Sequence, residues 1–254
     1  MSIWKSAKGE KHFKKYEKDL YRIVEGQHFI STRKLVDSDE EHDILEQVID
    51  RSKPIAPTKN SHGQLHYLLY TPFRYPPLKT GGRFHSVAEQ SIFYGSEELE
   101  TSMAEIAYGR FMFLELSAAK LEPMTVPYTH FMVKVKSDKA ILLTHAPFKN
   151  YRDKISSPSS YADSQPLGKD MREAGTELFA FFSARKKDGV NIGIFSVEAF
   201  AQNKPIASSD KNWSVYITDE IVEFQRSLIA KSGKESHPFK IEDFFFGSEF
   251  PRIY

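Results

Sequence analysis

The chain has 254 residues, 35 basic and 34 acidic side chains, and a hydrophobic content of 40%. This near-neutral balance argues against a general field that would draw the protein onto nucleic acid or an anionic membrane, and no apolar run predicts a secretory leader or a membrane span. The absence of cysteine excludes disulfides, thiolate metal ligands and a cysteine nucleophile. We therefore expect a soluble cytoplasmic protein built as one large domain with an extension.

Residues 1–60 are expected to form this extension, which is partly helical. Its lysine-rich start, mixed with acidic residues, predicts a solvated leading segment rather than an arm that binds nucleic acid. Ser38 and Glu41 have the spacing of a capping box, which predicts a helix start. An apolar stripe at helical spacing follows this cap: Ile44, Leu45, Val48 and Ile49. Two prolines and a glycine between residues 52 and 63 then predict a connector.

The remaining residues, 61–254, are expected to form the main domain. The apolar run at residues 65–73 predicts a buried strand that ends before Pro76 and Pro77, since neither proline can donate to a sheet. Short strands are expected at residues 82–86 and 90–95. The next segment predicts a helix over residues 96–114, whose apolar face includes Leu99, Met103 and Ile106.

The second half of this domain alternates between strand patterns and turns. Residues 129–148 predict two strands around a Ser-Asp turn, and residues 166–175 predict a short helix that ends at Gly175. Residues 176–200 predict two strands joined by a Lys-Lys-Asp-Gly turn, and residues 212–228 predict a strand followed by a helix. Because strands outnumber helices and short turns join several neighbours, we expect an α+β fold with a mixed or largely antiparallel sheet.

Three polar side chains follow one another at intervals of eleven residues: Arg83, Tyr94 and Glu105. Tyr94 ends a predicted strand, Glu105 lies off the apolar stripe of the predicted helix, and Arg83 follows two glycines that permit a close backbone turn. This layout can place all three side chains around one opening. By residue type alone, a solvated arginine, a packing tyrosine and a solvent-facing glutamate remain the alternative.

No other pattern predicts a site. The chain lacks the GxxxxGK[ST] and GxGxxG phosphate-binding motifs and the GxSxG nucleophile motif. His62 and His66 stand four residues apart, but they fall in a glycine-containing connector without a companion carboxylate motif. No metal site is therefore expected.

Five segments resemble those of the RES domain family, which is named for its Arg, Glu and Ser. They are GGRF, IFYGSEEL, TSMAEIAY, YADSQPLGKDMREAG and AFFSARKKDGVNIGIF, and the resemblance covers roughly residues 64–225. It assigns the family serine to Ser183, with Asn191 just downstream, and the family's earlier Arg-Tyr pair to Arg74 and Tyr75. Residues 30–54 also resemble the extension that longer members carry ahead of the domain.

The resemblance implies an ADP-ribosyltransferase-like fold that binds NAD⁺ in a cleft of a split sheet, with flanking helices. It further implies the toxin of a bacterial toxin–antitoxin pair, which destroys NAD⁺ by hydrolysis or phosphorolysis and is held inactive by a helix-turn-helix antitoxin of Xre type. NAD⁺ is then a substrate and not a resident cofactor. Inorganic phosphate is the second substrate if the reaction is a phosphorolysis.

The same resemblance implies a role for each site residue. Glu105 would stabilise the oxocarbenium-like ribose, and one carboxylate can suffice because nicotinamide leaves as a neutral base. Arg83 and Arg74 would pair with the pyrophosphate. Tyr94 would wall in the nicotinamide ring, and Ser183 would hydrogen-bond the nicotinamide amide or its ribose. Tyr75 and Asn191 are expected to bind substrate.

Two other functions remain open at this stage. One is an ADP-ribosyltransferase that modifies a macromolecule, and the other is a non-catalytic binding protein on the same scaffold. An intact set of Arg83, Tyr94, Glu105 and Ser183 argues against the second. The sequence does not choose between water and phosphate as acceptor, and it leaves open whether the protein forms a homo-oligomer.

Overall fold

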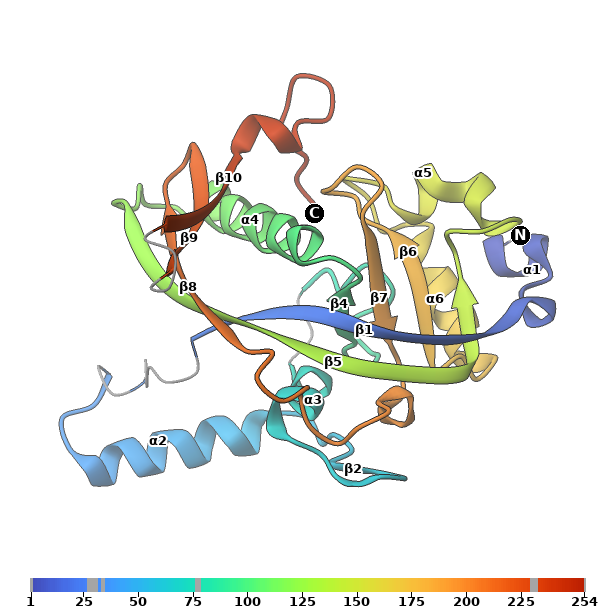
Figure 1. Cartoon of the computed structure of the whole chain (residues 1–254), viewed down its shortest axis with the longest axis horizontal. Coiled ribbons are helices and arrows are strands. Elements are labelled where there is room, and N and C mark those ends of the chain that lie inside the picture. The colour runs from blue at the N-terminus through green and yellow to red at the C-terminus, as the bar shows by residue number, and fades with distance from the viewer. Residues whose placement is uncertain (1, 27–31, 33–34, 76–78, 229–232, 254) are drawn as a thin grey trace.

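Two long strands organise the fold, which we describe from a computed structural model that covers residues 2–26, 32, 35–75, 79–228 and 233–253. Strand β1 (Phe13–Glu25) and strand β5 (Met124–Leu142) pair antiparallel, from Phe13 opposite Ile141 to Glu25 opposite Tyr128. Both strands run across the whole width of the molecule (Figure 1). Every other strand of the main sheet is attached directly or indirectly to this pair.

Five strands close on themselves into a ring. On one side of the β1–β5 pair lie β4 (Phe93–Ser96), β7 (Val190–Ile194) and β6 (Leu178–Phe182), in that order. The ring closes because β1 pairs with β4 while β5 pairs with β6. The β5–β6 pairing is parallel, and the other pairings of the described strands are antiparallel.

Three more strands extend the sheet from the other side of β5. They are β8 (Lys211–Ile217), β9 (Ile221–Leu228) and β10 (Gly233–Lys240). A separate small hairpin is formed by β2 (Lys59–Asn60) and β3 (Gly63–Gln64). The eight-stranded sheet with its mostly antiparallel pairing confirms the prediction of a mixed, largely antiparallel sheet flanked by helices.

Helix α4 (Leu99–Leu116) lies between the ring and the β8–β10 strands (Figure 1). The other helices lie around the sheet: α1 (Ile3–Ala7), α2 (Asp39–Ser52), α3 (Tyr67–Tyr70), α5 (Arg152–Ile155) and α6 (Ser164–Glu173). Short 3₁₀ helices span Gly9–His12, Thr71–Arg74, Phe148–Tyr151, Val197–Ala199 and Ile241–Phe244. No helix in the described part of the chain is long and apolar enough to cross a membrane.

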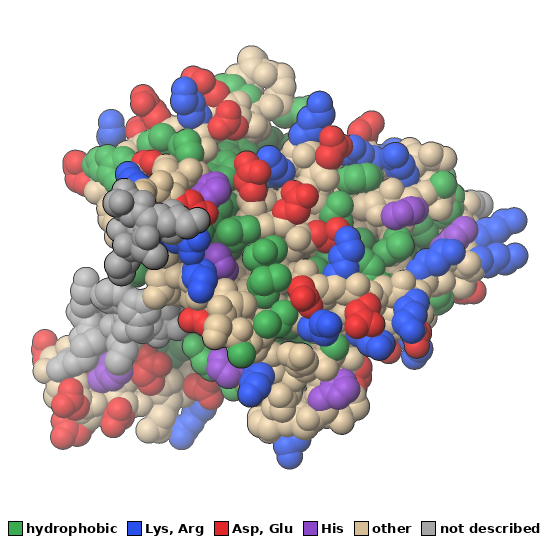
Figure 2. Space-filling model, viewed as in Figure 1, with side chains coloured by type: hydrophobic (Ala, Val, Ile, Leu, Met, Phe, Trp, Pro, Cys, Tyr) green, Lys and Arg blue, Asp and Glu red, His purple; other side chains and the backbone are tan. Residues whose placement is uncertain are grey.

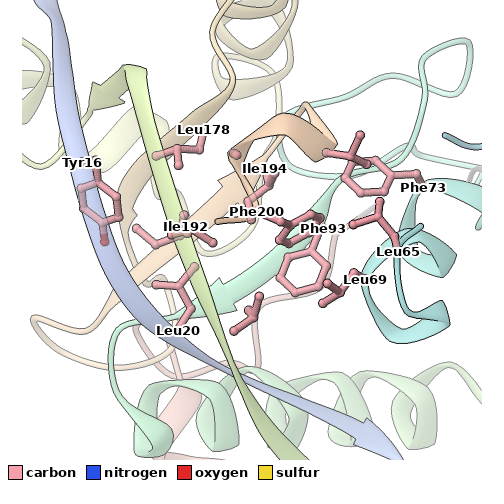
Figure 3. Close-up of a cluster of buried hydrophobic side chains, with 14 of the residues drawn as sticks. Tyr16, Leu20, Leu65, Leu69, Phe73, Phe93, Leu178, Ile192, Ile194 and Phe200 are labelled. Atoms are coloured by element: carbon pink, nitrogen blue, oxygen red, sulfur yellow. The ribbon is translucent and has the colours of Figure 1, made fainter. Parts of the chain in front are cut away.

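The core of the ring is a cluster of buried aliphatic and aromatic side chains from all five strands. Leu20, Phe93, Leu178, Ile192 and Ile194 point toward one another from β1, β4, β6 and β7, and Leu65, Leu69 and Phe73 close the cluster from below β4 (Figure 3). A second cluster lies between α4 and β8–β9, where Met103 and Phe111 pack with Val215 and Phe224. Burial of these side chains fixes α4 against the sheet.

The structure corrects the prediction of a solvated leading segment. Residues 13–25 form β1, and Tyr16, Leu20 and Ile23 of this strand are buried. Tyr16 and Leu20 lie on one face of β1 and pack in the core of the ring, whereas Ile23 lies on the other face and packs in the cluster with α4, so burial of both faces hides the simple alternation of a strand. The expected separate extension over residues 1–60 thus includes a strand of the main sheet.

Four further predictions of local structure are wrong. Residues 65–73 contain α3 and a 3₁₀ turn instead of a strand, since their buried residues Leu65, Leu69 and Phe73 recur every four positions. The Ser-Asp dipeptide at residues 137–138 does not turn but lies within β5. Residues 221–228 form β9, which pairs with β8, instead of a helix. The segment 82–86 is a tight turn and not a strand.

Other predictions are confirmed. The predicted helix over 96–114 is α4, the helix that ends near Gly175 is α6, and the strands flanking the Lys-Lys-Asp-Gly turn are β6 and β7. Gly175 adopts a positive φ of 78°, as a glycine after a helix end can. Ser38 caps α2 by accepting from the Glu41 amide. Pro76 and Pro77 lie outside the described residues.

Candidate functional site

A cavity of about 640 Å³ lies where α4 faces β1, β4 and β7. Its rim also includes the tight turn at residues 81–85 and the segment around Tyr161. The ionisable and amide side chains that line it are Arg22, Tyr75, Arg83, His85, Tyr94, Glu105, Tyr108, Tyr161, Arg185 and Asn191. Arg83, Tyr94 and Glu105, expected to surround one opening, are thus brought together by the fold.

Glu105 projects from α4, and its carboxylate is held from the sheet side. The Ser183 hydroxyl donates to Oε1 at 2.6 Å, and the Asn191 side-chain amide donates to the same oxygen at 2.5 Å. Both donors are buried, whereas Glu105 itself is half-buried. No described residue donates to Oε2, so one carboxylate oxygen is fixed and the other is left toward the cavity.

The two donors are themselves fixed by neighbouring strands. Asn191 in β7 lies opposite Ser96 in β4, and the Ser96 hydroxyl donates to the Asn191 side-chain oxygen at 2.7 Å. Ser183 directly follows β6, and its oxygen accepts from the backbone amides of Arg185 at 3.0 Å and Lys186 at 3.1 Å. A hydroxyl has one donor and two acceptor sites, so Ser183 has all its hydrogen bonds within the protein.

Arg83 lies in a tight turn that Gly81 and Gly82 make possible. Gly81 has a positive φ of 69°, and Gly82 exchanges backbone hydrogen bonds with His85 at 2.9 and 3.4 Å. Phe84 in this turn is fully buried, with its ring 4.6 Å from that of Phe179. Anchoring Phe84 in the core leaves Arg83 at the cavity, where its Nη1 donates to the Ser157 carbonyl at 2.7 Å and its guanidinium lies 4.9 Å from the Tyr161 ring centre.

Tyr94 lies in β4, and its ring meets that of Phe181 edge-on at 6.2 Å. The Tyr94 hydroxyl oxygen is shielded from solvent and has no hydrogen-bond partner among the described residues. The backbone of Phe84 lies near enough to affect its pKa. Burial raises the pKa of Tyr94, so the phenol is neutral at physiological pH. Tyr94 therefore gives the cavity an aromatic wall.

Arg22 of β1 is a cavity residue that the sequence analysis missed. It donates to the Tyr94 carbonyl, and its guanidinium lies 4.6 Å from the Phe93 ring centre. Burial lowers the pKa of Arg22, which a hydrogen bond to Tyr75 partly offsets. No described carboxylate pairs with it, and its Nε has no partner. The signal that could have found Arg22 is a lone arginine in the apolar end of β1, after three lysines of the same strand that face solvent.

A second group of missed residues surrounds Glu105. The Arg185 guanidinium stacks on the Tyr108 ring at 3.3 Å, and its Nη2 donates to the Pro158 carbonyl at 2.8 Å. Burial lowers the pKa of Arg185, and the nearby Tyr108 and Glu105 oppose this shift. Burial raises the pKa of Tyr108 to about 12. Arg185 directly follows the Ser-Ala pair of the serine segment, so its nearness to Ser183 was visible in the sequence.

Arg74 and Tyr75, which were expected to bind substrate together, are separated by the structure. Tyr75 lines the cavity, but Arg74 does not. The Arg74 guanidinium instead pairs with the Asp50 carboxylate at 3.0 Å and donates to the Asp50 and Pro54 carbonyls at the end of α2. The expected contact of Arg74 with a pyrophosphate is therefore not supported by its position, because its donors are turned toward α2.

The charges of the cavity define what it can bind. Three arginines line it, whereas Glu105 is its one acidic residue among those that the structure describes. Burial lowers the pKa of His85, the histidine of the cavity wall, which favours its neutral form. Such a wall favours a ligand with about two negative charges, and the single carboxylate can stabilise a positive charge beside it. No three acidic or histidine side chains of the described chain are grouped to hold a metal ion.

Comparisons with known proteins identify a domain and one solved structure. A family model described as "RES domain" matches residues 60–217, and no curated protein matches significantly. The chain is similar to a structure described as the crystal structure of the M. tuberculosis MbcT-MbcA toxin–antitoxin complex. The sequence identity is 12%, the TM-score is 0.44, and the match covers 85% of this chain and 91% of that one. This TM-score is too low to establish a shared fold.

Proposed function

The chain belongs to the RES domain family, and from this premise we propose that it is an enzyme that depletes NAD⁺ by cleaving the nicotinamide–ribose bond. We further propose that it acts as the toxin of a bacterial toxin–antitoxin pair, whose antitoxin is a helix-turn-helix protein of Xre type. This is the activity that family membership implies. The cavity around Glu105 supports it independently.

The observation that carries the proposal is a single carboxylate, held by two buried donors, in a cavity lined by three arginines. NAD⁺ carries two negative charges on its pyrophosphate and one positive charge on its nicotinamide ring. Arginines suit the pyrophosphate because a guanidinium binds phosphate oxygens through two parallel hydrogen bonds. Glu105 suits the positively charged nicotinamide ring because it supplies the one negative charge among the described residues of the cavity wall.

The leaving group explains why one carboxylate is enough. An ordinary glycosidase needs a second carboxyl group to protonate the departing oxygen. In NAD⁺ the bond between ribose C1′ and the pyridinium nitrogen breaks with its electron pair going to nitrogen, so nicotinamide leaves as a neutral molecule. The positive charge then develops on the ribose, and Glu105 stabilises it through the carboxylate oxygen left toward the cavity.

Several neighbouring side chains have a role in this reaction. Arg22 and Arg83 bind the pyrophosphate, and Tyr75 and Tyr94 form the walls around the ligand's rings. Ser183 and Asn191 act as positioning residues, since their donors are directed at Glu105. Arg74 has no role in the site. The oxygen of water or of inorganic phosphate attacks C1′, and with water a proton passes to solvent.

The fold proposed for this function is ADP-ribosyltransferase-like. The closed ring of strands supports the proposal, because β1, β4 and β7 present Arg22, Tyr94 and Asn191 to the same cavity. NAD⁺ bound against these strands would lie between them and α4, and its acceptor would enter through the mouth of the cavity. An antitoxin would inhibit the enzyme by covering this mouth.

The decisive experiment measures nicotinamide release from NAD⁺ by purified protein, with and without inorganic phosphate. We expect turnover by the wild type and a loss of about 10³-fold in Glu105→Gln, in line with the loss of a preorganised electrostatic contact. Glu115→Gln, on the same helix and outside the cavity, is the matched control and should retain turnover. Robust turnover by Glu105→Gln would contradict the assigned role.

The same assay distinguishes the acceptors. Free ADP-ribose indicates hydrolysis, and ADP-ribose 1″-phosphate that forms only with added phosphate indicates phosphorolysis. Labelled ADP-ribose attached to protein or nucleic acid would instead indicate a macromolecular ADP-ribosyltransferase. No consumption of NAD⁺ under any of these conditions would overturn the enzyme proposal.

A further inference from the structure

Helix α2 is an amphipathic helix whose apolar side is only partly covered. It has 14 residues, Asp39–Ser52, and none of them is buried. An isolated helix of this length is marginal in water, and helices of globular proteins normally gain their stability by burying an apolar face. In Figure 1 α2 lies apart from the main sheet, and α3 is near only its C-terminal end.

Arg74 ties this helix to the domain, and Thr32, which precedes the helix, hydrogen-bonds its His42 and Glu46 side chains. Arg74 pairs with Asp50 and donates to the carbonyls of Asp50 and Pro54, so the C-terminal end of α2 is held against the turn that follows α3. Leu45 and Ile49 of the same apolar stripe are half-buried. The attachment is thus specific at one end and leaves the rest of the apolar stripe uncovered.

The uncovered part of the stripe is formed by Ile44 and Val48, one helical turn apart. Their exposed fractions are 62% and 57%. Leu35 before the helix and Ile55 after it are more exposed still. Single exposed apolar residues need no explanation, but an aligned pair on a helix with further apolar residues at both ends is typical of a surface that binds another chain.

The charge of α2 indicates which kind of chain fits. The helix carries six acidic residues and one arginine, whereas the whole chain is near neutral. Acidic side chains gather over α2 on the surface in Figure 2. Two copies of α2 facing each other would oppose like charges, which disfavours self-association through this stripe. A basic segment would be attracted and oriented by the same charges.

We propose that the stripe formed by Ile44 and Val48, with its acidic surroundings, docks a basic protein segment that presents an apolar helical face. Such a segment covers the two apolar side chains while its lysines or arginines face the acidic residues of α2. The surface lies outside the NAD⁺ cavity, since no residue of α2 lines that cavity. This inference therefore does not depend on the proposed enzyme activity.

The test uses the full-length protein and two labelled synthetic peptides of leucine and lysine, each long enough for about five helical turns. In the first peptide the leucines lie on one helical face, and in the second the same residues are scrambled around the helix. We expect fluorescence anisotropy to show that the wild type binds the first peptide about tenfold more tightly or better. In the double variant Ile44→Ser/Val48→Ser this preference should disappear.

A matched control separates this surface from general hydrophobicity. Phe113 and Leu116 form another exposed apolar pair, on α4, with exposed fractions of 52% and 60%. Phe113→Ser/Leu116→Ser should keep the full preference for the first peptide. Circular dichroism melting of both double variants establishes that they fold like the wild type.

Two results would overturn the proposal. One is equal binding of both peptides, or binding that Ile44→Ser/Val48→Ser leaves unchanged. The other is a dimer of the wild type in sedimentation analysis that this double variant abolishes, because the occupant of the stripe would then be a second copy. Reversal of charge in Glu40→Lys/Asp43→Lys should lower the affinity for both peptides. Tighter binding of either peptide by that variant would also contradict the proposal of a basic partner.

Discussion

The chemistry of the site depends on how single side chains are held. Glu105 receives two hydrogen bonds on one oxygen, and both donors, Ser183 and Asn191, are in turn fixed by groups from adjacent strands. Arg22 and Arg185 are both shielded enough that burial lowers their pKa values, and neither forms an ion pair with a described carboxylate, although Glu105 lies near Arg185. Burying such cations costs free energy of folding, which is expected where a ligand supplies the missing negative charge.

Ser183→Ala tests whether the hydroxyl positions Glu105 or touches substrate. Loss of a hydrogen bond to a charged group costs about 1.5–3 kcal/mol, so we expect kcat for nicotinamide release to fall by about 10- to 100-fold. KM for NAD⁺ should stay within about twofold, because the hydroxyl is directed at Glu105. A large rise in KM would instead indicate direct contact with the ligand. Ser159→Ala, in an exposed loop, is the control.

Arg22→Met tests whether the buried cation serves binding at the expense of stability. Methionine keeps the apolar stem and removes the uncompensated charge, so the free energy of unfolding should be unchanged or higher. The affinity for ADP-ribose should fall by about tenfold or more, as expected for a lost charged contact. Calorimetric titration and thermal melting measure the two effects. Unchanged affinity would contradict the role of Arg22, and Arg74→Met serves as the control that keeps affinity.

At the scale of elements, the site is assembled where the ends of strands meet one helix and one tight turn. Strand β4 ends at Ser96, β6 ends just before Ser183, and β7 begins just before Asn191. Helix α4 presents Glu105 to this edge. Helix α6 approaches the turn that carries Arg83 very closely. A Cβ atom at Gly168 in this helix would lie 2.1 Å from the Phe84 carbonyl oxygen. The absence of a side chain at this position is what lets the turn pack against α6.

Gly168→Ala should therefore displace this turn. We expect a loss of about 1–3 kcal/mol in the free energy of unfolding, because backbone must move to admit the methyl group. NAD⁺ turnover should also fall, since Arg83 moves with Phe84. Gly109→Ala in α4 is the matched control: nothing lies within 4 Å of its added Cβ, so it should stabilise the protein by about 0.5–1 kcal/mol. Chemical denaturation measures the free energy of unfolding of both variants. Equal changes in Gly168→Ala and Gly109→Ala would contradict the close packing of Gly168 against Phe84.

At the scale of the whole molecule, the ring of strands joins residues that are far apart in the chain. Arg22 near one end, Glu105 in the middle and Asn191 beyond it meet at one cavity because β1 pairs with both β4 and β5 and β4 pairs with β7. The same sheet extends to β8–β10, where His130 of β5 is buried and accepts a hydrogen bond from Trp213 of β8 at 2.9 Å. This bond requires the neutral imidazole.

Stability should fall in mild acid because of this histidine. Burial lowers the pKa of His130 below its usual 6.5, and nearby Arg226 and Lys211 act in the same direction against Glu235 and Asp210. The unfolded chain then binds a proton that the folded chain excludes. The stabilisation is present above pH 6.5 and is lost as the pH falls from 6.5 toward the lower folded-state pKa, by at most about 1.4 kcal/mol per pH unit.

His130→Gln retains an acceptor for Trp213 but does not titrate. Its free energy of unfolding, measured by urea denaturation between pH 8 and 5 (about the range in which histidine titrates), should depend less steeply on pH than that of the wild type. At the alkaline end the imidazole is neutral in both states, so any difference there reports packing alone. An unchanged slope would contradict the role of His130, and His66 and His85, whose pKa values are also lowered, would remain as the source.

The sequence by itself determined the class of fold and part of the site. The helices α4 and α6, the β6–β7 hairpin and the glycine turn that carries Arg83 can be predicted from sequence. Each of them depends on residues that are close together in the chain. The resemblance to the RES domain family supplied Ser183 and Asn191, which periodicity alone does not join to Glu105.

Only the tertiary structure decided which residues share the cavity. Arg22 lies in a strand that buries residues on both faces, which hides its alternation. Arg74, next to Tyr75, turns to Asp50 because the end of α2 offers acceptors there. Whether an arginine faces a ligand or a helix end depends on pairings between distant segments, and local patterns do not record them. The closure of β1 onto β4 and β5 is such a pairing, and it places the first strand of the chain in the wall of the site.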